Sequence, residues 1–218
     1  MRSDPMPPTP ETPCASGRSP GGSGLPRLLV LIHGRGRART LRNLAERIAR
    51  GELRAEIALV LATHDAEAAA IARDELGLRV LHRPGNLDAH TLDHLAREER
   101  IDLVVLAGYL RLLEIPPGLE GRVVNIHPAL LPDFGGPGMY GDRVHAAVLA
   151  AASAPGGPAE SGCTVHLCDN TYDTGPVLAQ ARVPILPGDT PQTLAARVFE
   201  AECGLYPRVI ADLLQRRG

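Results

Sequence analysis

Short apolar runs alternate with segments of helical periodicity along most of this 218-residue chain. The first run, RLLVLIH at residues 27–33, is almost entirely apolar, which is typical of a strand covered on both faces of a sheet. A helix is predicted next, at residues 41–50, because apolar side chains recur there every three or four positions and Thr40 can cap its first amides. A repeated strand-then-helix pattern predicts a largely parallel sheet with helices on both faces.

The same alternation continues to the end of the chain. Further strands are predicted at 56–61, 79–81, 103–106, 123–126, 162–167 and 177–184, and further helices at 66–75, 89–100, 142–152 and 190–215. The predicted fold class is therefore α/β, with a doubly wound, mostly parallel, Rossmann-like sheet in a single domain over residues 27–218. Residues 1–26 are rich in Pro, Gly and Ser without apolar periodicity, so we expect a disordered extension there.

The charge balance and the missing lysines exclude several classes of function. A net charge of -2 gives the chain no general attraction for nucleic acid or for an anionic membrane, so small molecules are the expected partners. All 23 basic residues are arginines, which excludes chemistry that needs a lysine, such as Schiff-base catalysis. The chain has neither a long apolar run nor an apolar leader, and we expect a cytoplasmic monomer or homodimer.

The segment GRGRART, at residues 34–40, joins the first predicted strand to the first predicted helix. A Gly-rich turn at the amino end of a helix presents free backbone amides, and its arginines add positive charge, so the segment is a candidate phosphate site. The candidate residues of this site are Gly34, Gly36, Arg37, Arg39 and Thr40. The alternative is a solvated basic turn in an arginine-rich chain.

Two polar residues, Asn125 and His127, fall on one face at the carboxyl end of the apolar strand VVNI. That edge is where open α/β sheets bind ligands. An amide can hold a carbonyl oxygen while an imidazole moves a proton or stabilises an oxyanion, which suits the transfer of a carbonyl-type group. A histidine alone is most often structural, but the neighbouring Asn125, Pro128 and Pro132 favour the functional interpretation.

The turn CDNTYDTGP places Asp169 and Asp173 between two predicted strands. Either carboxylate could orient His127 or accept a proton from an attacking amine, and spacing alone does not choose between them. Both could also simply close the turn, as Asp commonly does. The histidines elsewhere in the chain show no ligand-type pairing with carboxylates, so no metal site is expected.

Five motifs in unbroken order carry a family resemblance: LAGYLRLL at 106–113, NIHPALLP at 125–132, GMYGDRVH at 138–145, GCTVHL at 162–167 and DNTYDTGPVLAQ at 169–180. With them the chain resembles the folate-dependent formyltransferase family, and within it the enzymes that formylate the amine of glycinamide ribonucleotide in de novo purine biosynthesis. The resemblance implies 10-formyltetrahydrofolate as co-substrate, with no permanently bound cofactor and no metal.

The resemblance also implies a role for each residue of the catalytic centre. Asn125 is expected to bind the formyl oxygen, and His127 to stabilise the tetrahedral intermediate. Asp173 is expected to position His127 and a water that shuttles protons. His166 matches a supporting histidine on the neighbouring strand.

The two substrates are expected at opposite sides of that centre. The residues expected to bind folate are Tyr109, Leu110, Arg111, Leu112, Leu113 and Asp169. The first Gly-rich loop is expected to hold the acceptor's phosphate, and Glu202 its ribose hydroxyls. The loop is longer than its family counterpart and lacks that loop's Ser-Asn pair, and a family arginine near Asp88 is missing; the loop arginines can replace both contributions.

Because of these departures, three other functions stay open. One is a related formyltransferase that acts on a different amine, such as a sugar-nucleotide amine. Another is a formyltetrahydrofolate hydrolase, and a third is a binding module with an idle site. The intact set Asn125, His127 and Asp173 argues against the third.

Overall fold

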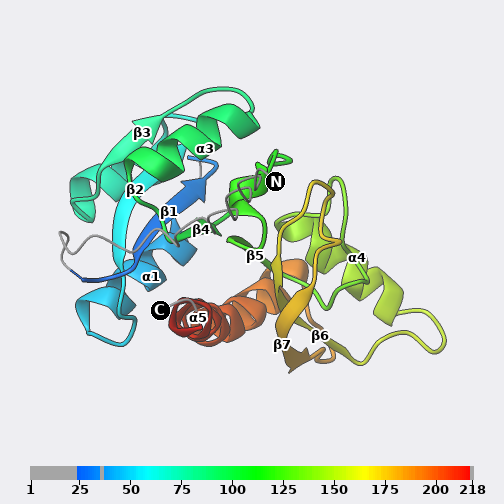
Figure 1. Cartoon of the computed structure of the whole chain (residues 1–218). Coiled ribbons are helices and arrows are strands. Elements are labelled where there is room, and N and C mark those ends of the chain that lie inside the picture. Colours follow the sequence, from blue (N-terminus) through cyan, green and yellow to red (C-terminus); the bar gives the residue numbers. More distant parts are fainter. Residues whose placement is uncertain (1–23, 35–36, 217–218) are drawn as a thin grey trace, which may run out of the picture.

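The computed structural model describes residues 24–34 and 37–216, and within them seven strands form one sheet in the order β3-β2-β1-β4-β5-β6-β7 (Figure 1). The strands are β1 (Arg27–Ile32), β2 (Glu56–Ala62), β3 (Val80–His82), β4 (Leu103–Leu106), β5 (Val123–His127), β6 (Glu160–Leu167) and β7 (Val177–Pro184). The first five strands are parallel, and β6 and β7 each run antiparallel to the strand before them. The predicted α/β class is confirmed, while most of the predicted extension lies outside the described residues.

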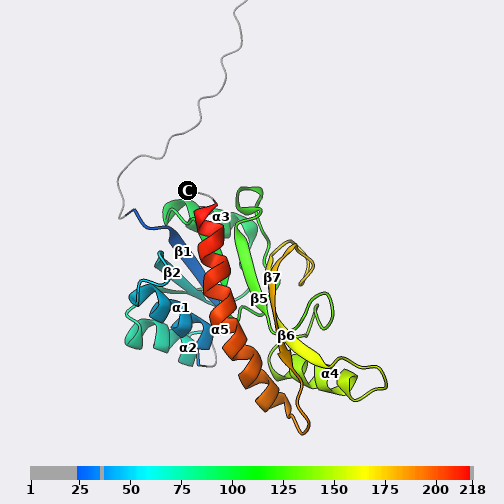
Figure 2. The same ribbon diagram turned by 90° about the horizontal axis from the view of Figure 1, so that it is seen from below.

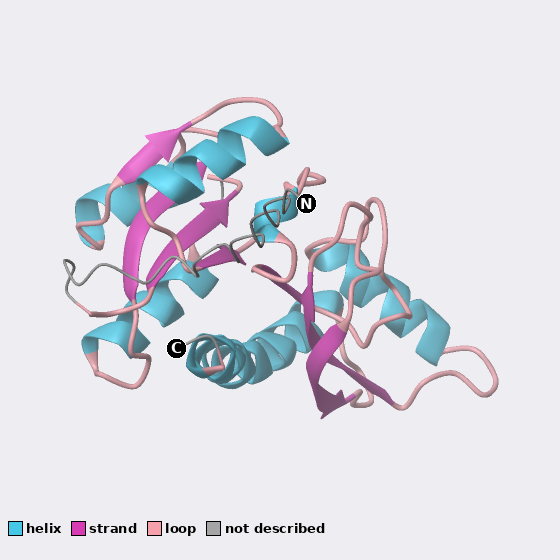
Figure 3. Ribbon diagram, viewed as in Figure 1, coloured by secondary structure: helices cyan, strands magenta, loops and turns pink. Residues whose placement is uncertain are grey.

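Helices cover both faces of the sheet (Figure 3). They are α1 (Arg39–Ala49), α2 (Glu67–Ala70), α3 (Ala89–Glu98), α4 (Asp142–Ala152) and α5 (Pro191–Gln215), with a π-helical turn η1 (Ile71–Glu75) and a 3-10 turn η2 (Pro117–Leu119). Because side chains alternate along a strand, Leu28 and Val30 of β1 pack into the core on one face, and Leu29 and Leu31 into the core on the other. Burial on both faces explains the unbroken apolar runs of the central strands.

The long helix α5 crosses one face of the sheet (Figure 2). Thr190 caps its first turn by accepting a hydrogen bond from the amide of Thr193. The buried hydroxyl of Tyr206 lies 2.9 Å from the carbonyl oxygens of both Leu106 and Val124. These two hydrogen bonds hold helix α5 against β4 and β5, the two strands whose ends carry the candidate site.

A few boundaries differ from the prediction. Helix α1 begins at Arg39, and its cap is Ala38, which has a positive φ of 50°. Thr40 therefore lies inside the first turn, and its predicted role as a cap is wrong. The predicted helix at 66–75 is confirmed only in part, because its second half is π-helical. Strand β3 is shifted by one residue from the predicted 79–81.

Candidate active site

A cavity of about 270 Å³ opens at the carboxyl ends of β4 and β5. Two loops form much of its wall, residues 108–113 after β4 and residues 136–141 before α4. The other lining residues come from α1, α5, the strand ends and the turn after β6: Thr40, Glu202, Leu106, Asn125, Ile126, His127, Pro128, His166, Cys168, Asp169, Thr171, Tyr172 and Asp173. This edge of an open α/β sheet is where such folds bind their ligands.

Asn125 and His166 face each other across the β5–β6 pair. The Asn125 amide nitrogen Nδ2 lies 3.1 Å from His166 Nε2, and His166 Nδ1 lies 2.9 Å from the carbonyl oxygen of Leu167. Nδ1 must carry a proton to donate to that carbonyl, and Nε2 lies near both the Asn125 amide and Asp173 Oδ1, which is 3.5 Å away. The contact with Nε2 fixes the Asn125 amide plane at the cavity wall.

His127 ends β5 and is almost fully buried, with 3% of its surface exposed. Its Nε2 donates to the carbonyl oxygen of Phe134 at 2.8 Å, and its Nδ1 lies 3.6 Å from Asp173 Oδ2. Burial lowers the pKa of His127 below its ordinary value, against the opposing charge of Asp173. The ring is therefore neutral at neutral pH, and Nδ1 is free to accept a proton beside a carboxylate.

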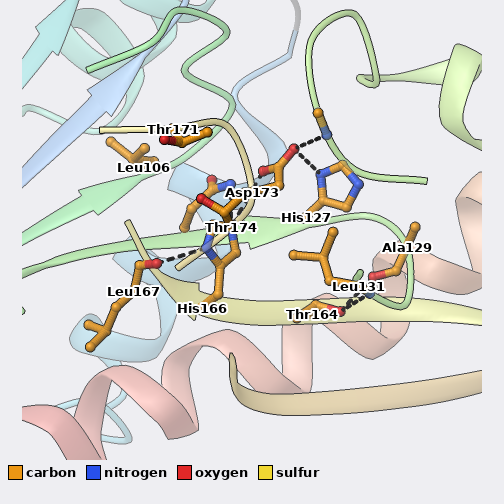
Figure 4. A network of polar contacts seen from close by, with 12 residues as sticks. Leu106, His127, Ala129, Leu131, Thr164, His166, Leu167, Thr171, Asp173 and Thr174 are labelled. Carbon is orange, nitrogen blue, oxygen red and sulfur yellow. Dashed lines mark hydrogen bonds and ion pairs between the residues drawn. The ribbon is translucent and has the colours of Figure 1, made fainter. Parts of the chain in front are cut away.

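Asp173 stands between the two histidines (Figure 4). Its Oδ1 lies 3.5 Å from His166 Nε2, and its Oδ2 accepts a hydrogen bond of 2.9 Å from the amide of Gly136. Burial raises the pKa of Asp173, but its interactions with His166, His127 and the Gly136 amide together hold it below its ordinary value. Asp173 is therefore ionised when the site is at neutral pH.

The second aspartate of the turn has a different environment. Asp169 accepts hydrogen bonds from the amide of Thr171 at 2.9 Å and from the hydroxyl of Thr174 at 2.9–3.0 Å. These are the contacts of a residue that closes a turn. Asp169 still lines the cavity, but Asp173 is the aspartate that contacts His127, a choice that residue spacing left open.

The segment expected to bind folate forms one wall of the same cavity. Tyr109 and Leu113 are buried in the core, whereas Leu110 and Leu112 are more than one third exposed. Arg111 donates to Asn86 Oδ1 at 2.8 Å. The wall is therefore apolar with one cationic side chain near its edge, which suits a flat aromatic ligand that carries polar groups.

The residues expected to bind the acceptor divide into two groups. Thr40 and Glu202 line the cavity. Arg37 and Arg39 instead line a separate hollow together with Arg42, and Gly36 lies outside the described residues. The Arg39 guanidinium lies 3.6 Å from the centre of the Phe199 ring on α5, one helical turn before Glu202.

Gly34 does not line the cavity, and its role is in the local backbone. Its φ is +90°, and a side chain there would place a Cβ only 1.9 Å from the carbonyl oxygen of His64. Only glycine fits this close approach. Gly34 therefore sets the path by which the chain leaves β1 toward α1.

Two contributors to the site were not found from the sequence. Phe134 and Gly136 act through their backbone carbonyl and amide, which bind His127 and Asp173 respectively. Every residue has these groups, so no side-chain pattern could have indicated them. The segment DFGGPG gave only the signal of a loop.

In the part of the chain that the structure describes, no three His, Cys, Asp or Glu side chains are arranged to hold a metal ion. No helix of these residues combines the length and apolar character needed to cross a bilayer.

Known proteins resemble this chain in sequence. The phosphoribosylglycinamide formyltransferase of Vigna unguiculata is 38% identical over 201 residues, which are 88% of this chain and 62% of that protein. The enzyme of the same name from Arabidopsis thaliana is 36% identical over 210 residues, or 90% of this chain and 69% of that protein. The chain thus spans about two thirds of the length of these plant relatives.

Both plant relatives are named as chloroplastic, which contradicts the cytoplasmic location expected from the sequence. That expectation relied on the lack of an apolar leader. A leader of that kind belongs to secreted proteins, whereas plastid transit peptides have no apolar core, so its lack does not indicate the cytoplasm.

Solved structures resemble the fold. Glycinamide ribonucleotide transformylase 1 of Symbiobacterium toebii superposes with a TM-score of 0.73 at 31% identity, over 90% of this chain and 92% of that one. Phosphoribosylglycinamide formyltransferase of Anaplasma phagocytophilum gives a TM-score of 0.74 at 31% identity, over 87% of each chain. The formyl transferase family itself matches residues 26–210, nearly the whole of the described chain. This protein belongs to the formyl transferase family.

Proposed function

We propose that the protein transfers the formyl group of 10-formyltetrahydrofolate to the primary amine of glycinamide ribonucleotide. The observation that carries the proposal is the convergence of Asn125, His127 and Asp173 on one cavity. The apolar segment 109–113 forms a wall of that cavity. The names of the plant and bacterial relatives support the choice of acceptor.

In the proposed reaction the acceptor's amine nitrogen attacks the formyl carbon. A bond forms between that nitrogen and the carbon, and the bond between the carbon and N10 of the folate breaks. The amine loses one proton and N10 gains one, so the reaction needs no oxidant and no further reactant. The carbonyl oxygen becomes negative in the tetrahedral intermediate, and the Asn125 amide on the cavity wall can donate a hydrogen bond to it.

His127 and Asp173 can carry the proton that passes from the amine to N10. His127 is neutral before reaction and takes up a proton at Nδ1 as the intermediate forms. The carboxylate of Asp173, 3.6 Å away, stabilises the resulting imidazolium without itself becoming protonated. The imidazolium then stabilises the oxyanion and supplies a proton for the departing nitrogen.

Glu202 gives the acceptor subsite a dependence on pH. Burial raises the pKa of Glu202 to about 7, although the charge of Arg39 acts in the opposite direction. Above that pH the ionised carboxylate accepts strong hydrogen bonds from ribose hydroxyls, and below it the protonated group accepts weaker ones. We therefore expect the KM for the acceptor to rise as the pH falls from 8 to 6.

The variant Glu202→Gln tests this subsite. Loss of a charge-assisted hydrogen bond should raise the acceptor KM about tenfold at pH 8 and remove its pH dependence. The pKa of Glu202 is about 7 in the folded protein, above the ordinary value of 4.5. Wild type therefore loses stability as the pH rises from 4.5 to about 7. Glu202→Gln should therefore melt at a higher temperature than wild type at pH 8, with little difference at pH 5. A pH-dependent KM that persists in the variant would exclude Glu202 as the titrating group.

The amino end of α1 is the proposed phosphate subsite. Among the described residues no side chain caps this helix, so its first amides can bind an anion beside Thr40 on the cavity wall. Arg37 and Arg39 line the neighbouring hollow, but they stand at the start of this helix and place positive charge beside the subsite. Replacing both by Ala should therefore raise the acceptor KM about tenfold and leave the folate KM unchanged. The matched control is Arg42→Ala, since Arg42 lines the same hollow but pairs with Glu75 at 2.7 Å. An equal effect of the control would point to general charge rather than a phosphate contact.

The proposed reaction is tested by product analysis. The pure protein is incubated with 10-formyltetrahydrofolate and, separately, glycinamide ribonucleotide, a sugar-nucleotide amine, or no amine. We expect formylated glycinamide ribonucleotide and negligible formate. Formylation of the sugar-nucleotide amine alone, or release of formate without an amine, would replace the proposal with the corresponding alternative.

A further inference from the structure

Three hydrogen bonds tie the loop after β5 to the two antiparallel strands, and a fourth joins the two side chains that make them. Thr164 of β6 is completely buried; its hydroxyl accepts from the amide of Leu131 at 2.9 Å and donates to the carbonyl oxygen of Ala129 at 2.7 Å (Figure 4). Gln180 of β7 donates from Nε2 to the carbonyl oxygen of Leu131 at 2.9 Å and to the Thr164 hydroxyl at 3.0 Å. Both backbone polar groups of Leu131 are therefore held by side chains from neighbouring strands.

These residues lie outside the cavity but connect to its wall. Neither Thr164 nor Gln180 is among the described residues that line it. The link runs through the Leu131 side chain, which packs against Gly135: a Cβ added at Gly135 would lie 2.7 Å from Leu131 Cδ2 and 3.2 Å from Asp173 Cβ. Leu131, Gly135 and Asp173 thus form one packed row from the anchored loop to the catalytic centre.

The two residues on either side of Gly135 make the contacts that orient the catalytic centre. The carbonyl oxygen of Phe134 receives the Nε2 proton of His127, and the amide of Gly136 donates to Asp173. A shift of Leu131 would move Gly135 and therefore both of these groups. The proton of His127 stays on Nε2 only while the Phe134 carbonyl remains in place to receive it.

We propose that Thr164 and Gln180 are positioning residues for the reaction: by fixing Leu131 they hold the Phe134 carbonyl in place, and so determine which nitrogen of His127 carries the proton. The inference rests on the proposed role of His127 in formyl transfer. Neither residue touches the reacting atoms. Their effect is on the orientation and protonation of His127, where small displacements have large consequences for rate.

Three variants separate this role from a general loss of structure. Thr164→Val keeps the shape of the side chain but removes the hydroxyl, and Gln180→Met keeps the length but removes the donor. Thr164→Ser restores the hydroxyl. The matched control is Ser161→Ala on the same strand, since Ser161 is also buried and its hydroxyl has no hydrogen-bond partner among the described residues.

The first measurement is the two-substrate kinetics of formyl transfer. Thr164→Val should lower kcat about tenfold and Gln180→Met about threefold, with both KM values changed less than about twofold. Thr164→Ser should recover most of the loss, and Ser161→Ala should match wild type. Normal kcat in both Thr164→Val and Gln180→Met would overturn the inference. If Thr164→Val does not fold, Gln180→Met and Thr164→Ser carry the comparison.

The second measurement does not need the reaction. Nitrogen-15 shifts of the His127 ring report the tautomer and the pKa directly, with His127→Ala used to assign its signals. Wild type should show a single Nε2-protonated tautomer, while Thr164→Val and Gln180→Met should show a mixture and a shifted pKa. Unchanged shifts beside a lowered kcat would mean a merely structural role and would overturn the inference. If wild type forms no formylated glycinamide ribonucleotide, the proposed function fails, and the ring shifts still decide the inference.

Discussion

Replacing His127 by Ala should lower kcat/KM by at least about two orders of magnitude and leave the fold intact. His127 contacts both the Phe134 carbonyl and Asp173, and burial holds it neutral and ready to accept a proton. Alanine removes the proton acceptor and the cation that forms beside the oxyanion. Since both act mainly in the transition state, kcat should fall far more than either KM rises.

The control for His127→Ala is His94→Ala. His94 lies on α3 with its side chain 62% exposed and pairs only with Glu98 in the described structure. Its removal should change neither stability nor rate measurably. Steady-state kinetics with both substrates, together with a melting curve for each variant, make the comparison. Near-normal turnover in folded His127→Ala would remove His127 from the mechanism.

The sheet and the first two catalytic candidates were predictable because they depend on local periodicity. The apolar run of β5 ends in Asn125 and His127, which share one face whatever the rest of the chain does. The parallel order of the strands follows from the alternation with helices. The structure confirms the fold and places these two residues on the wall of one cavity.

The rest of the site depends on contacts between distant parts of the chain. Asp169 and Asp173 lie four residues apart in one turn, and sequence gives each the same chemistry. The left-handed backbone at Asp173, with φ of 56°, accompanies its approach to the two histidines, while Asp169 bonds within the turn. Local spacing does not encode which of the two meets His127.

The acceptor region was the least predictable part for a similar reason. Arg37 and Arg39 follow a strand and precede a helix, which favours a phosphate site on local grounds. Their placement beside the cavity or away from it depends on Phe199 and the course of α5, more than 150 positions later in the chain. The structure places these arginines in a neighbouring hollow, while Thr40 lines the cavity.

Asp173→Asn should lower kcat by about two orders of magnitude, and its design isolates the charge of this residue. Asparagine matches aspartate in size and tolerates the left-handed backbone at this position, so no strain is added. Its side-chain oxygen can still accept from the Gly136 amide, which keeps the turn in place. The control Asp65→Asn removes a half-exposed carboxylate whose described partner is Arg73.

The pH profile of Asp173→Asn distinguishes an electrostatic role from a structural one. The Asp173 carboxylate raises the pKa of His127, while burial lowers it. The variant lacks the negative charge that counteracts the effect of burial, so the pKa of His127 should fall further below its ordinary value. The acid limb of the rate profile, where His127 becomes protonated and inactive as a base, should therefore move to lower pH in the variant. A low rate with an unmoved limb would mean that Asp173 acts by holding the turn, and near-normal turnover would exclude it from the mechanism. The expected pair, a large fall in kcat with a limb displaced toward acid, requires that one carboxylate both sets the proton affinity of His127 and stabilises the imidazolium formed during transfer.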